Sequence, residues 1–175
     1  MSALRERLQA MEGDISMLAI EAIVNAANES LIMGGGVDGA IRGKAGDEME
    51  RDLRQIGRCP TGQAILTDGY ALPARFVIHT VAPIWLGGGS AQKIALLAAC
   101  CRNALALARM HAIAAVAFPC LGTGIYGWPA DLAAETAFST VATFLGEHDT
   151  PQRVVFCCFS PTDRERYETA IGRLG

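Results

Sequence analysis

Six short apolar runs alternate along the chain with segments of helical periodicity, and this alternation constrains the fold more than any other feature. Several of the runs are apolar at consecutive positions rather than at every second position. Consecutive apolar residues are typical of strands covered on both faces, as in a parallel sheet between two layers of helices. We therefore expect strands at Arg5–Met11, Ala22–Asn25, Ala64–Thr67, Arg75–Val81, Ala114–Phe118 and Val154–Phe159.

Apolar residues recur at helical spacing between these runs. One stripe repeats every four residues over 37–53, and others cover 94–108 and 133–144. A last helix is expected to begin with Ser160 as its N-cap and Pro161 in its first turn. Strands that alternate with helices in this way predict an α/β fold, a three-layer α/β/α sandwich with a mixed central sheet.

The composition narrows the function classes. Of the 175 residues, 51% are hydrophobic and 19% are charged, so we expect a folded chain with one domain over residues 1–175. The net charge of −3 argues against nucleic acid or a membrane surface as a partner, but allows one small anionic ligand. The six cysteines form no C-x-x-C pair, and the N-terminus lacks the apolar core of a secretory signal. We therefore expect a cytoplasmic protein with reduced thiols and no metal site.

Two glycine-rich segments each join an expected strand to an expected helix. Residues 34–36 (GGG) follow the strand at 22–25, and residues 122–127 (GTGIYG) follow the strand at 114–118. Glycine N–H groups at a helix N-terminus suit a phosphate, because no Cβ blocks the approach and the helix dipole favours an anion. Either segment alone could equally be a tight turn. Two such loops in one small domain favour an extended ligand, such as a pyrophosphate.

The second glycine segment also matches G-x-G-x-x-G, the fingerprint of dinucleotide-binding proteins. A Rossmann unit additionally requires a second strand that ends in an acidic residue about 20 positions further on. The nearest candidate, Glu147, ends a helical pattern, and only 48 residues follow Gly127. A Rossmann-type dinucleotide oxidoreductase is therefore the more distant alternative.

Polar side chains bracket the first glycine segment. Asn25 ends a strand, Asn28 follows it, and Asp38 lies in the first turn of the next helix. Amide side chains can hold sugar hydroxyls, and a carboxylate can hold a water or take its proton. Each residue also has a structural interpretation, as a turn former or a first-turn acid. His79 lies in a strand among apolar residues, which is typical of a hydrogen-bonded core histidine rather than of a catalytic group.

The order of these motifs resembles the macrodomain family over nearly the whole chain. Within the family, the chain is most similar to the MacroD-like branch, which includes bacterial O-acetyl-ADP-ribose deacetylases. The resemblance rests on GDI at 13–15, IVNAAN at 23–28, GGGVDGAI at 34–41, TG at 61–62, GYALPA at 69–74, VIHTV at 77–81, AFP at 117–119, TGIYG at 123–127 and FCCF at 156–159.

The resemblance implies a macrodomain fold that binds ADP-ribose in a cleft at the strand ends. It implies that Asp14 accepts a hydrogen bond from the adenine amino group, that Ile15 lies beside it, and that Phe159 packs against the adenine ring. It places Asn28 at the distal ribose and Asp38 at the reacting centre, as the two catalytic residues. The further ligand-binding residues that it implies are Asn25, Gly35, Gly36, Val37, Gly122, Thr123, Gly124, Ile125 and Tyr126.

Two positions depart from the pattern of the MacroD-like branch. Gly122 stands where serine is usual, which removes a hydroxyl from the second loop but leaves its backbone donors. Arg42 stands where histidine is common. Arg42 follows Asp38 by four residues on a helix, a spacing at which the two charges can meet, and such a pairing would compete with a role of the carboxylate as a base. The alternative is an Arg42 side chain that points into solvent.

The sequence therefore predicts an ADP-ribose-binding hydrolase that cleaves esters at the distal ribose, with no cofactor. The expected reactions are deacetylation of O-acetyl-ADP-ribose and removal of mono-ADP-ribose from acidic side chains, so the expected partners are ADP-ribose, O-acetyl-ADP-ribose and mono-ADP-ribosylated proteins. A water held by Asp38, or by a phosphate oxygen of the substrate, would attack the ester carbon or the anomeric carbon while Asn28 holds the sugar. The alternative is a non-catalytic ADP-ribose reader module, which the departure at Arg42 keeps open.

Overall fold

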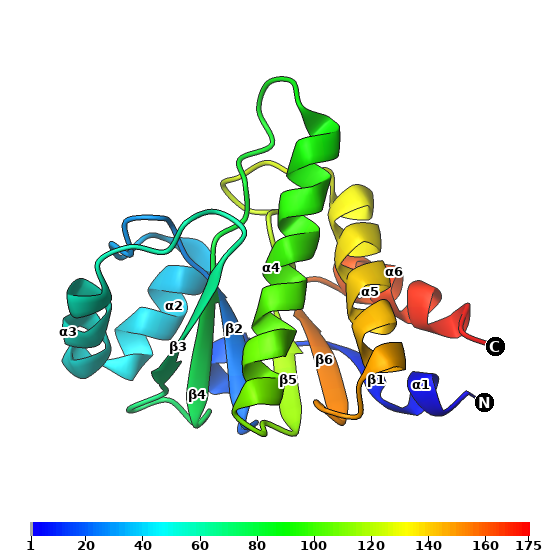
Figure 1. Cartoon of the computed structure of the whole chain (residues 1–175), viewed down its shortest axis with the longest axis horizontal. Helices are drawn as coiled ribbons and strands as arrows, with labels where there is room; N and C mark the ends of the chain where they lie inside the picture. Colours follow the sequence, from blue (N-terminus) through cyan, green and yellow to red (C-terminus); the bar gives the residue numbers. More distant parts are fainter. Residues whose placement is uncertain (1) are drawn as a thin grey trace.

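A six-stranded sheet runs through the centre of the computed structural model, which describes residues 2–175. The strand order is β1-β6-β5-β2-β4-β3, and every neighbouring pair is parallel except β3 and β4, which are antiparallel (Figure 1). The mixed sheet is as predicted. Its strands are β1 (Leu8–Glu12), β2 (Ala22–Ala26), β3 (Ala64–Asp68), β4 (Phe76–Thr80), β5 (Ala115–Phe118) and β6 (Arg153–Cys158).

Helices cover both faces of this sheet. Alternate residues of a strand point to opposite faces, so Val24 joins the core beneath α4, α5 and α6, whereas Ile23 joins the core beneath α2, α3 and η1. The three-layer sandwich is confirmed. The helices are α1 (Ala3–Glu6), the 3-10 helix η1 (Ile15–Met17), α2 (Gly36–Ala45), α3 (Asp47–Ile56), α4 (Ser90–Met110), α5 (Ala130–Glu147) and α6 (Pro161–Gly172).

By length and mean hydropathy alone, one helix in the described part of the chain, α4, would be long and apolar enough to cross a membrane. In this fold α4 lies along the sheet beside α5 (Figure 1). Leu97, Cys101 and Leu105 on its inner face are fully buried. These residues belong to the hydrophobic core beneath this face of the sheet.

The segments that follow the two central strands, β2 and β5, lead to opposite faces of the sheet. β2 and β5 are parallel neighbours, with Ala22 beside Val116. From β2 the chain continues into α2 on one face, and from β5 it continues into α5 on the other. The two connections diverge and leave a crevice at the carboxyl ends of these strands. Ligands of open α/β sheets bind at such a topological switch point.

Most predicted elements are confirmed, and two differ. Five predicted strands agree with the structure to within one residue at each end, and α6 begins as predicted, with the Ser160 side chain accepting from the backbone N–H of Asp163. The strand predicted at Arg5–Met11 instead begins at Leu8. A short helix precedes it, because the Ser2 hydroxyl caps the backbone N–H of Arg5.

The apolar stripe over 37–53 is divided between α2 and α3. The chain turns at Gly46, whose φ of +93° lies in the left-handed region that favours glycine. Ile41, Met49 and Leu53 are all buried on the same face of the sheet. The four-residue spacing therefore predicted correctly which residues are buried, but it missed the break between α2 and α3 at Gly46.

Candidate functional site

A cavity of about 340 Å³ opens at the carboxyl ends of β2 and β5, in the crevice between their two connections. The loop between β2 and α2 forms one wall, and the loop between β5 and α5 forms the other. The lining residues are Ala26, Ala27, Asn28, Gly34, Gly35, Gly36, Val37, Asp38, Pro119, Cys120, Gly122, Gly124, Ile125 and Tyr126.

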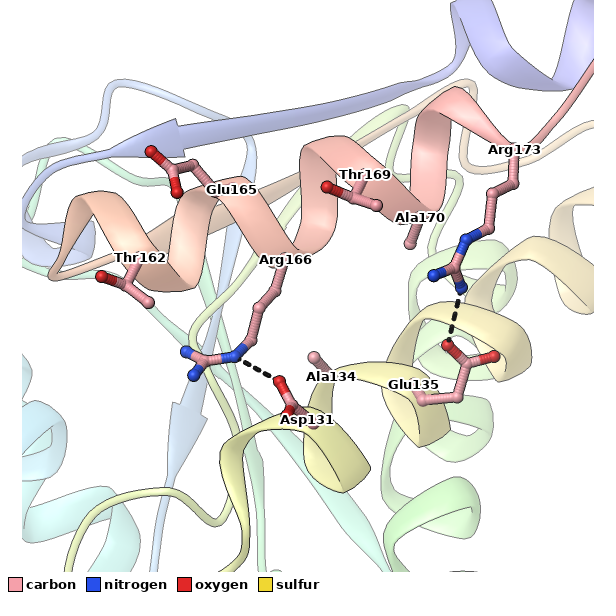
Figure 2. Close-up of a pocket in the computed structure, with 9 residues that line it drawn as sticks. All are labelled: Asp131, Ala134, Glu135, Thr162, Glu165, Arg166, Thr169, Ala170 and Arg173. Atoms are coloured by element: carbon pink, nitrogen blue, oxygen red, sulfur yellow. Dashed lines mark hydrogen bonds and ion pairs between the residues drawn. The ribbon is translucent and has the colours of Figure 1, made fainter.

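A second hollow, of about 360 Å³, lies between α5 and α6 (Figure 2). Figure 2 shows Arg166 reaching from α6 toward Asp131 on α5, where the two pair at 2.6 Å, and Arg173 pairs with Glu135 at 3.6 Å. These charges are partly exposed and compensate one another. Neither glycine-rich loop borders this hollow. The cavity at the strand ends is therefore the candidate site.

The first wall offers uncapped backbone donors. Gly35 occupies the N-cap of α2, so no side chain satisfies the first N–H groups of that helix. A Cβ on Gly35 or Gly36 would meet no atom within 4 Å, although both residues line the cavity. Gly36 also has a left-handed φ of +57°. Free N–H groups at the positive end of a helix dipole favour an anion here.

The carboxylate of Asp38 fixes the shape of this wall. Its Oδ1 accepts a hydrogen bond from Nδ2 of Asn25 at 2.7 Å, and its Oδ2 accepts from the backbone N–H of Gly34 at 2.6 Å. Nη1 of Arg42 lies 3.6 Å from Oδ2, so of the two placements that the helical spacing left open, Arg42 pairs with Asp38 rather than pointing into solvent. Asp38 is only 4% exposed, yet it borders the cavity. Its carboxylate is thus held in one orientation.

A buried row of polar groups supports Asp38 from behind. Nδ2 of Asn25 lies 3.0 Å from Nδ1 of His79, and Nε2 of His79 lies 2.9 Å from the Thr67 hydroxyl. Because that hydroxyl donates to a backbone carbonyl, it accepts from Nε2–H, and Nδ1 of the neutral ring accepts from Asn25. Burial, reinforced by the charge of Arg42, lowers the pKa of His79 to about 3. His79 is therefore the hydrogen-bonded core histidine that its sequence context predicted.

Asn28 lies at the edge of the cavity on the loop that follows β2. Its Nδ2 donates to the backbone carbonyl of Ile32 at 2.6 Å, and its Oδ1 accepts from the backbone N–H of Ile32 at 3.2 Å. The Ser30 hydroxyl donates to the same oxygen at 2.9 Å. The amide of Asn28 is thus oriented by the backbone of its own loop.

The second wall requires glycine at position 122. The φ of Gly122 is +84°, and a Cβ there would lie 2.6 Å from Cδ1 of Trp128. The Trp128 side chain is held in this position, because its Nε1 donates to the carbonyl of Pro83 at 2.8 Å and its ring packs against Trp85, with the centroids 4.6 Å apart. The indole behind the loop is a physical reason for glycine where the related branch usually has serine.

The tip of the second wall is open. A Cβ on Gly124 would meet no atom within 4 Å, and Ile125 is 85% exposed. The backbone carbonyl of Tyr126 accepts from the N–H of Trp85 at 2.9 Å, which ties the end of the loop to the tryptophan pair. Thr123 lies apart from the cavity, because its hydroxyl donates to the carbonyl of Cys120 inside the turn.

The residues expected at an adenine ring lie further along the same edge of the sheet. Asp14 and Phe159 come just after β1 and β6, and these strands end side by side. Asp14 accepts from Ser16 and from Nζ of Lys44, at 3.0 Å. The hydrogen bonds from Ser16, and then Lys44, hold the pKa of Asp14 below its usual value. Phe159 is 62% exposed, and Ile15 is buried.

The structure gathers nine of the predicted site residues on the cavity: Asn28, Gly35, Gly36, Val37, Asp38, Gly122, Gly124, Ile125 and Tyr126. The placement of Asn25 differs from the expectation of a ligand contact, because its side chain is fully buried behind Asp38. Gly34, from the predicted glycine segment, also lines the cavity. Sequence reasoning missed Ala26, Ala27, Pro119 and Cys120. These four residues lie at the ends of β2 and β5, so the predicted strand ends were the signal that could have identified them. Within residues 2–175, no group of three or more His, Cys, Asp or Glu side chains could hold a metal ion.

Comparison with known proteins identifies relatives of the whole chain. The family model described as "Macro domain" matches residues 24–137. The O-acetyl-ADP-ribose deacetylase of Escherichia coli is 42% identical over 98% of this chain and 99% of its own. The ADP-ribose glycohydrolase MACROD2 of Xenopus laevis is 45% identical over 99% of this chain, which spans 42% of that protein. The Trypanosoma brucei macrodomain solved in complex with ADP-ribose superposes with a TM-score of 0.90 at 37% identity, over 98% of this chain and 72% of the other.

Proposed function

The chain belongs to the Macro domain family, and we propose that it binds ADP-ribose and hydrolyses esters at the distal ribose, with O-acetyl-ADP-ribose as a substrate. One observation carries the proposal. The cavity combines two open glycine-rich walls with the side chains of Asn28 and Asp38 at its inner edge. Such a site provides backbone donors for phosphate and, beside them, polar groups for a sugar and a water.

The spacing of the strands suits an extended ligand. The predicted adenine residues follow β1 and β6, whereas Asn28 follows β2. In the order β1-β6-β5-β2, β1 lies three strand spacings from β2 and β6 lies two, or about 14 Å and about 9.5 Å at the usual distance between strands. An ADP-ribose molecule would lie along this edge with its diphosphate between the two glycine-rich loops. Asp14 and Phe159 would hold its adenine, and Asn28 its distal ribose.

The chemistry requires no covalent intermediate on the protein. A water oxygen adds to the acyl carbon, the bond from that carbon to the ribose oxygen breaks, and the ribose oxygen takes up a proton. Asn28 would hold the ribose in the attack geometry, and Asp38 would hold the water, either alone or with a phosphate oxygen of the substrate. Asn25 is then a positioning residue, since its amide holds Asp38 at 2.7 Å without reaching the cavity.

Removal of ADP-ribose from acidic side chains is the same class of reaction. An aspartyl or glutamyl ester at the distal ribose presents the same carbonyl carbon and leaving oxygen as the acetyl ester. The Xenopus laevis relative is named an ADP-ribose glycohydrolase, and this name denotes cleavage at an anomeric carbon. Attack of the water at the anomeric carbon of the distal ribose is therefore the alternative to attack at the acyl carbon for this substrate. Ile125, which lines the cavity, is 85% exposed, so this end of the cavity opens to solvent.

A non-catalytic reader is the second candidate, and one observation favours it. Asp38 is buried, and Asn25, Gly34 and Arg42 already surround its carboxylate. A carboxylate with three partners can serve to shape the loop without handling a water. Turnover separates the two candidates, since both bind ADP-ribose.

Replacement of Asn28 or Asp38 by alanine is expected to lower the kcat for O-acetyl-ADP-ribose by more than about tenfold, or at least ~1.4 kcal/mol of barrier. Both changes remove side chains at the distal end of the site. Phe159→Ala should mainly raise KM, because this exposed ring would contact only the adenine. Steady-state kinetics with chromatography of the released ADP-ribose measures both effects. Full turnover in both the Asn28 and the Asp38 variant would refute their assignment.

We also propose one domain over residues 1–175 and a cytoplasmic location. A single sheet supports both hydrophobic cores, which favours one folding unit. All six cysteines are free thiols, as suits a reducing compartment.

A further inference from the structure

Behind the site, Arg42 and Glu50 form a close ion pair that joins α2 to α3. Nε and Nη2 of Arg42 donate to the two carboxylate oxygens of Glu50, each at 2.6 Å. This bidentate geometry is the strongest and most directional form of an arginine–carboxylate pair. The Arg42 side chain is 2% exposed, and that of Glu50 is 22% exposed. The pair therefore fixes the guanidinium from one side.

The same guanidinium contacts both segments that carry the proposed catalytic residues. Nη2 also donates to the backbone carbonyl of Leu31 at 2.8 Å, and Nη1 lies 3.6 Å from Oδ2 of Asp38. Nη1 has no hydrogen-bond partner within the described residues, so its buried charge is directed only at Asp38. Arg42 thus links Glu50 to Asp38 and to the loop that follows β2.

Leu31 has an unfavourable backbone conformation in the loop that follows β2. Its φ of +55° is unfavourable for a residue with a branched side chain, and such conformations persist only where the surroundings hold them. Leu31 is buried, its N–H donates to the carbonyl of Asn28, and its own carbonyl is held by Arg42. The next residue, Ile32, orients the amide of Asn28 through two backbone hydrogen bonds.

We propose that Glu50 is a positioning residue for hydrolysis, acting through Arg42 on Asn28 and Asp38. This inference rests on the proposed function of the site. Without the carboxylate of Glu50, the guanidinium loses its fixed orientation, and the carbonyl of Leu31 loses a directed donor. The Asn28 loop and Asp38 then lose their common support from Arg42, whereas Asn25 and the N–H of Gly34 still hold the Asp38 carboxylate and with it the glycine-rich wall at the diphosphate.

The test is Glu50→Gln, which keeps the size of the side chain and removes its charge. The matched control is Glu48→Gln, an exposed glutamate on the same helix. We expect Glu50→Gln to lower the kcat for O-acetyl-ADP-ribose about tenfold, with the Kd for ADP-ribose changed by less than about threefold. The control should match the unmodified protein in both. Because a general loss of folding would weaken binding as well, this separation of kcat from Kd distinguishes positioning from a merely structural role.

Two further measurements sharpen the test. Arg42→Lys keeps the charge but cannot form the bidentate contact with Glu50. Because both residues act through the same contact, the double variant Arg42→Lys/Glu50→Gln should lower kcat by about tenfold in total rather than by the product of the two single effects. Hydrogen exchange at the amide of Ile32 should be at least about tenfold faster in Glu50→Gln than in Glu48→Gln. The exchange measurement tests the contact between Arg42 and the Asn28 loop even if the protein hydrolyses no ester. Unchanged kcat in Glu50→Gln, or exchange equal to that of the control, would overturn the inference.

Discussion

Replacement of Gly124 by valine is expected to weaken ADP-ribose binding by at least about a hundredfold, or roughly 2.7 kcal/mol, from a micromolar Kd in the unmodified protein. Gly124 borders the cavity, and a Cβ there meets no atom within 4 Å. Its φ lies outside the left-handed region. Valine therefore fits the fold without strain, but its branched side chain would occupy space that the diphosphate needs.

Gly88→Val is the matched control, since Gly88 is an equally open loop glycine away from the cavity. Calorimetric titration with ADP-ribose compares the two variants, and their melting temperatures should agree with that of the unmodified protein. AMP, which lacks the distal half of the ligand, should bind more weakly than ADP-ribose. Binding of ADP-ribose to Gly124→Val within about threefold of the unmodified protein would contradict a diphosphate between the two loops.

Acid should destabilise the protein through His79. Its pKa is lowered from 6.5 to about 3 in the folded state, mainly by burial. Between these values the unfolded chain binds a proton that the native protein does not. Falling pH therefore favours the unfolded state, and the loss begins near pH 6.5 and is complete near pH 3. Between pH 7 and pH 4, this one residue should remove about 3 kcal/mol from the free energy of unfolding.

Urea unfolding across this pH range measures the effect, with His79→Gln as the test and exposed His111→Gln as the control. The glutamine variant does not titrate, so its free energy of unfolding should be lower at pH 7 but should fall less steeply below pH 6.5. The carboxylates titrate alike in both variants and cancel in the comparison. Parallel pH profiles for His79→Gln and His111→Gln would show that protonation of His79 does not contribute.

The strands and the glycine-rich walls could be predicted because their signals are local. A buried parallel strand appears as consecutive apolar residues, and a glycine segment between a strand and a helix predicts an open N-terminus. The point where one helix ends and the next begins was harder to predict. The stripe over 37–53 kept its four-residue spacing across Gly46, because α2 and α3 turn the same face to the sheet. Periodicity alone cannot distinguish this arrangement from one helix.

The partners of the buried polar residues could be predicted only in part. Helical spacing allowed Arg42 to pair with Asp38, as it does, but the stronger bonds of Arg42 go to Glu50 on the next helix. Nothing in the sequence indicates that α3 folds back so that this carboxylate reaches the guanidinium. Asn25 and Asn28 likewise form one motif in the sequence, yet one is buried behind Asp38 and the other lies at the cavity. Only the strand end at Ala26 separates their environments.

The most direct measurement of the proposed hydrolysis is single-turnover cleavage of O-acetyl-ADP-ribose by the unmodified protein in oxygen-18 water. Attack of a positioned water on the acyl carbon predicts equal amounts of ADP-ribose and acetate, with one heavy oxygen in the acetate and none at the ribose oxygen that carried the acetyl group. Chromatography quantifies the two products, and fragmentation in the mass spectrometer locates the label. Tight binding of ADP-ribose with the ester left intact would instead establish a reader, and label at the ribose oxygen that carried the acetyl group would contradict attack at the acyl carbon.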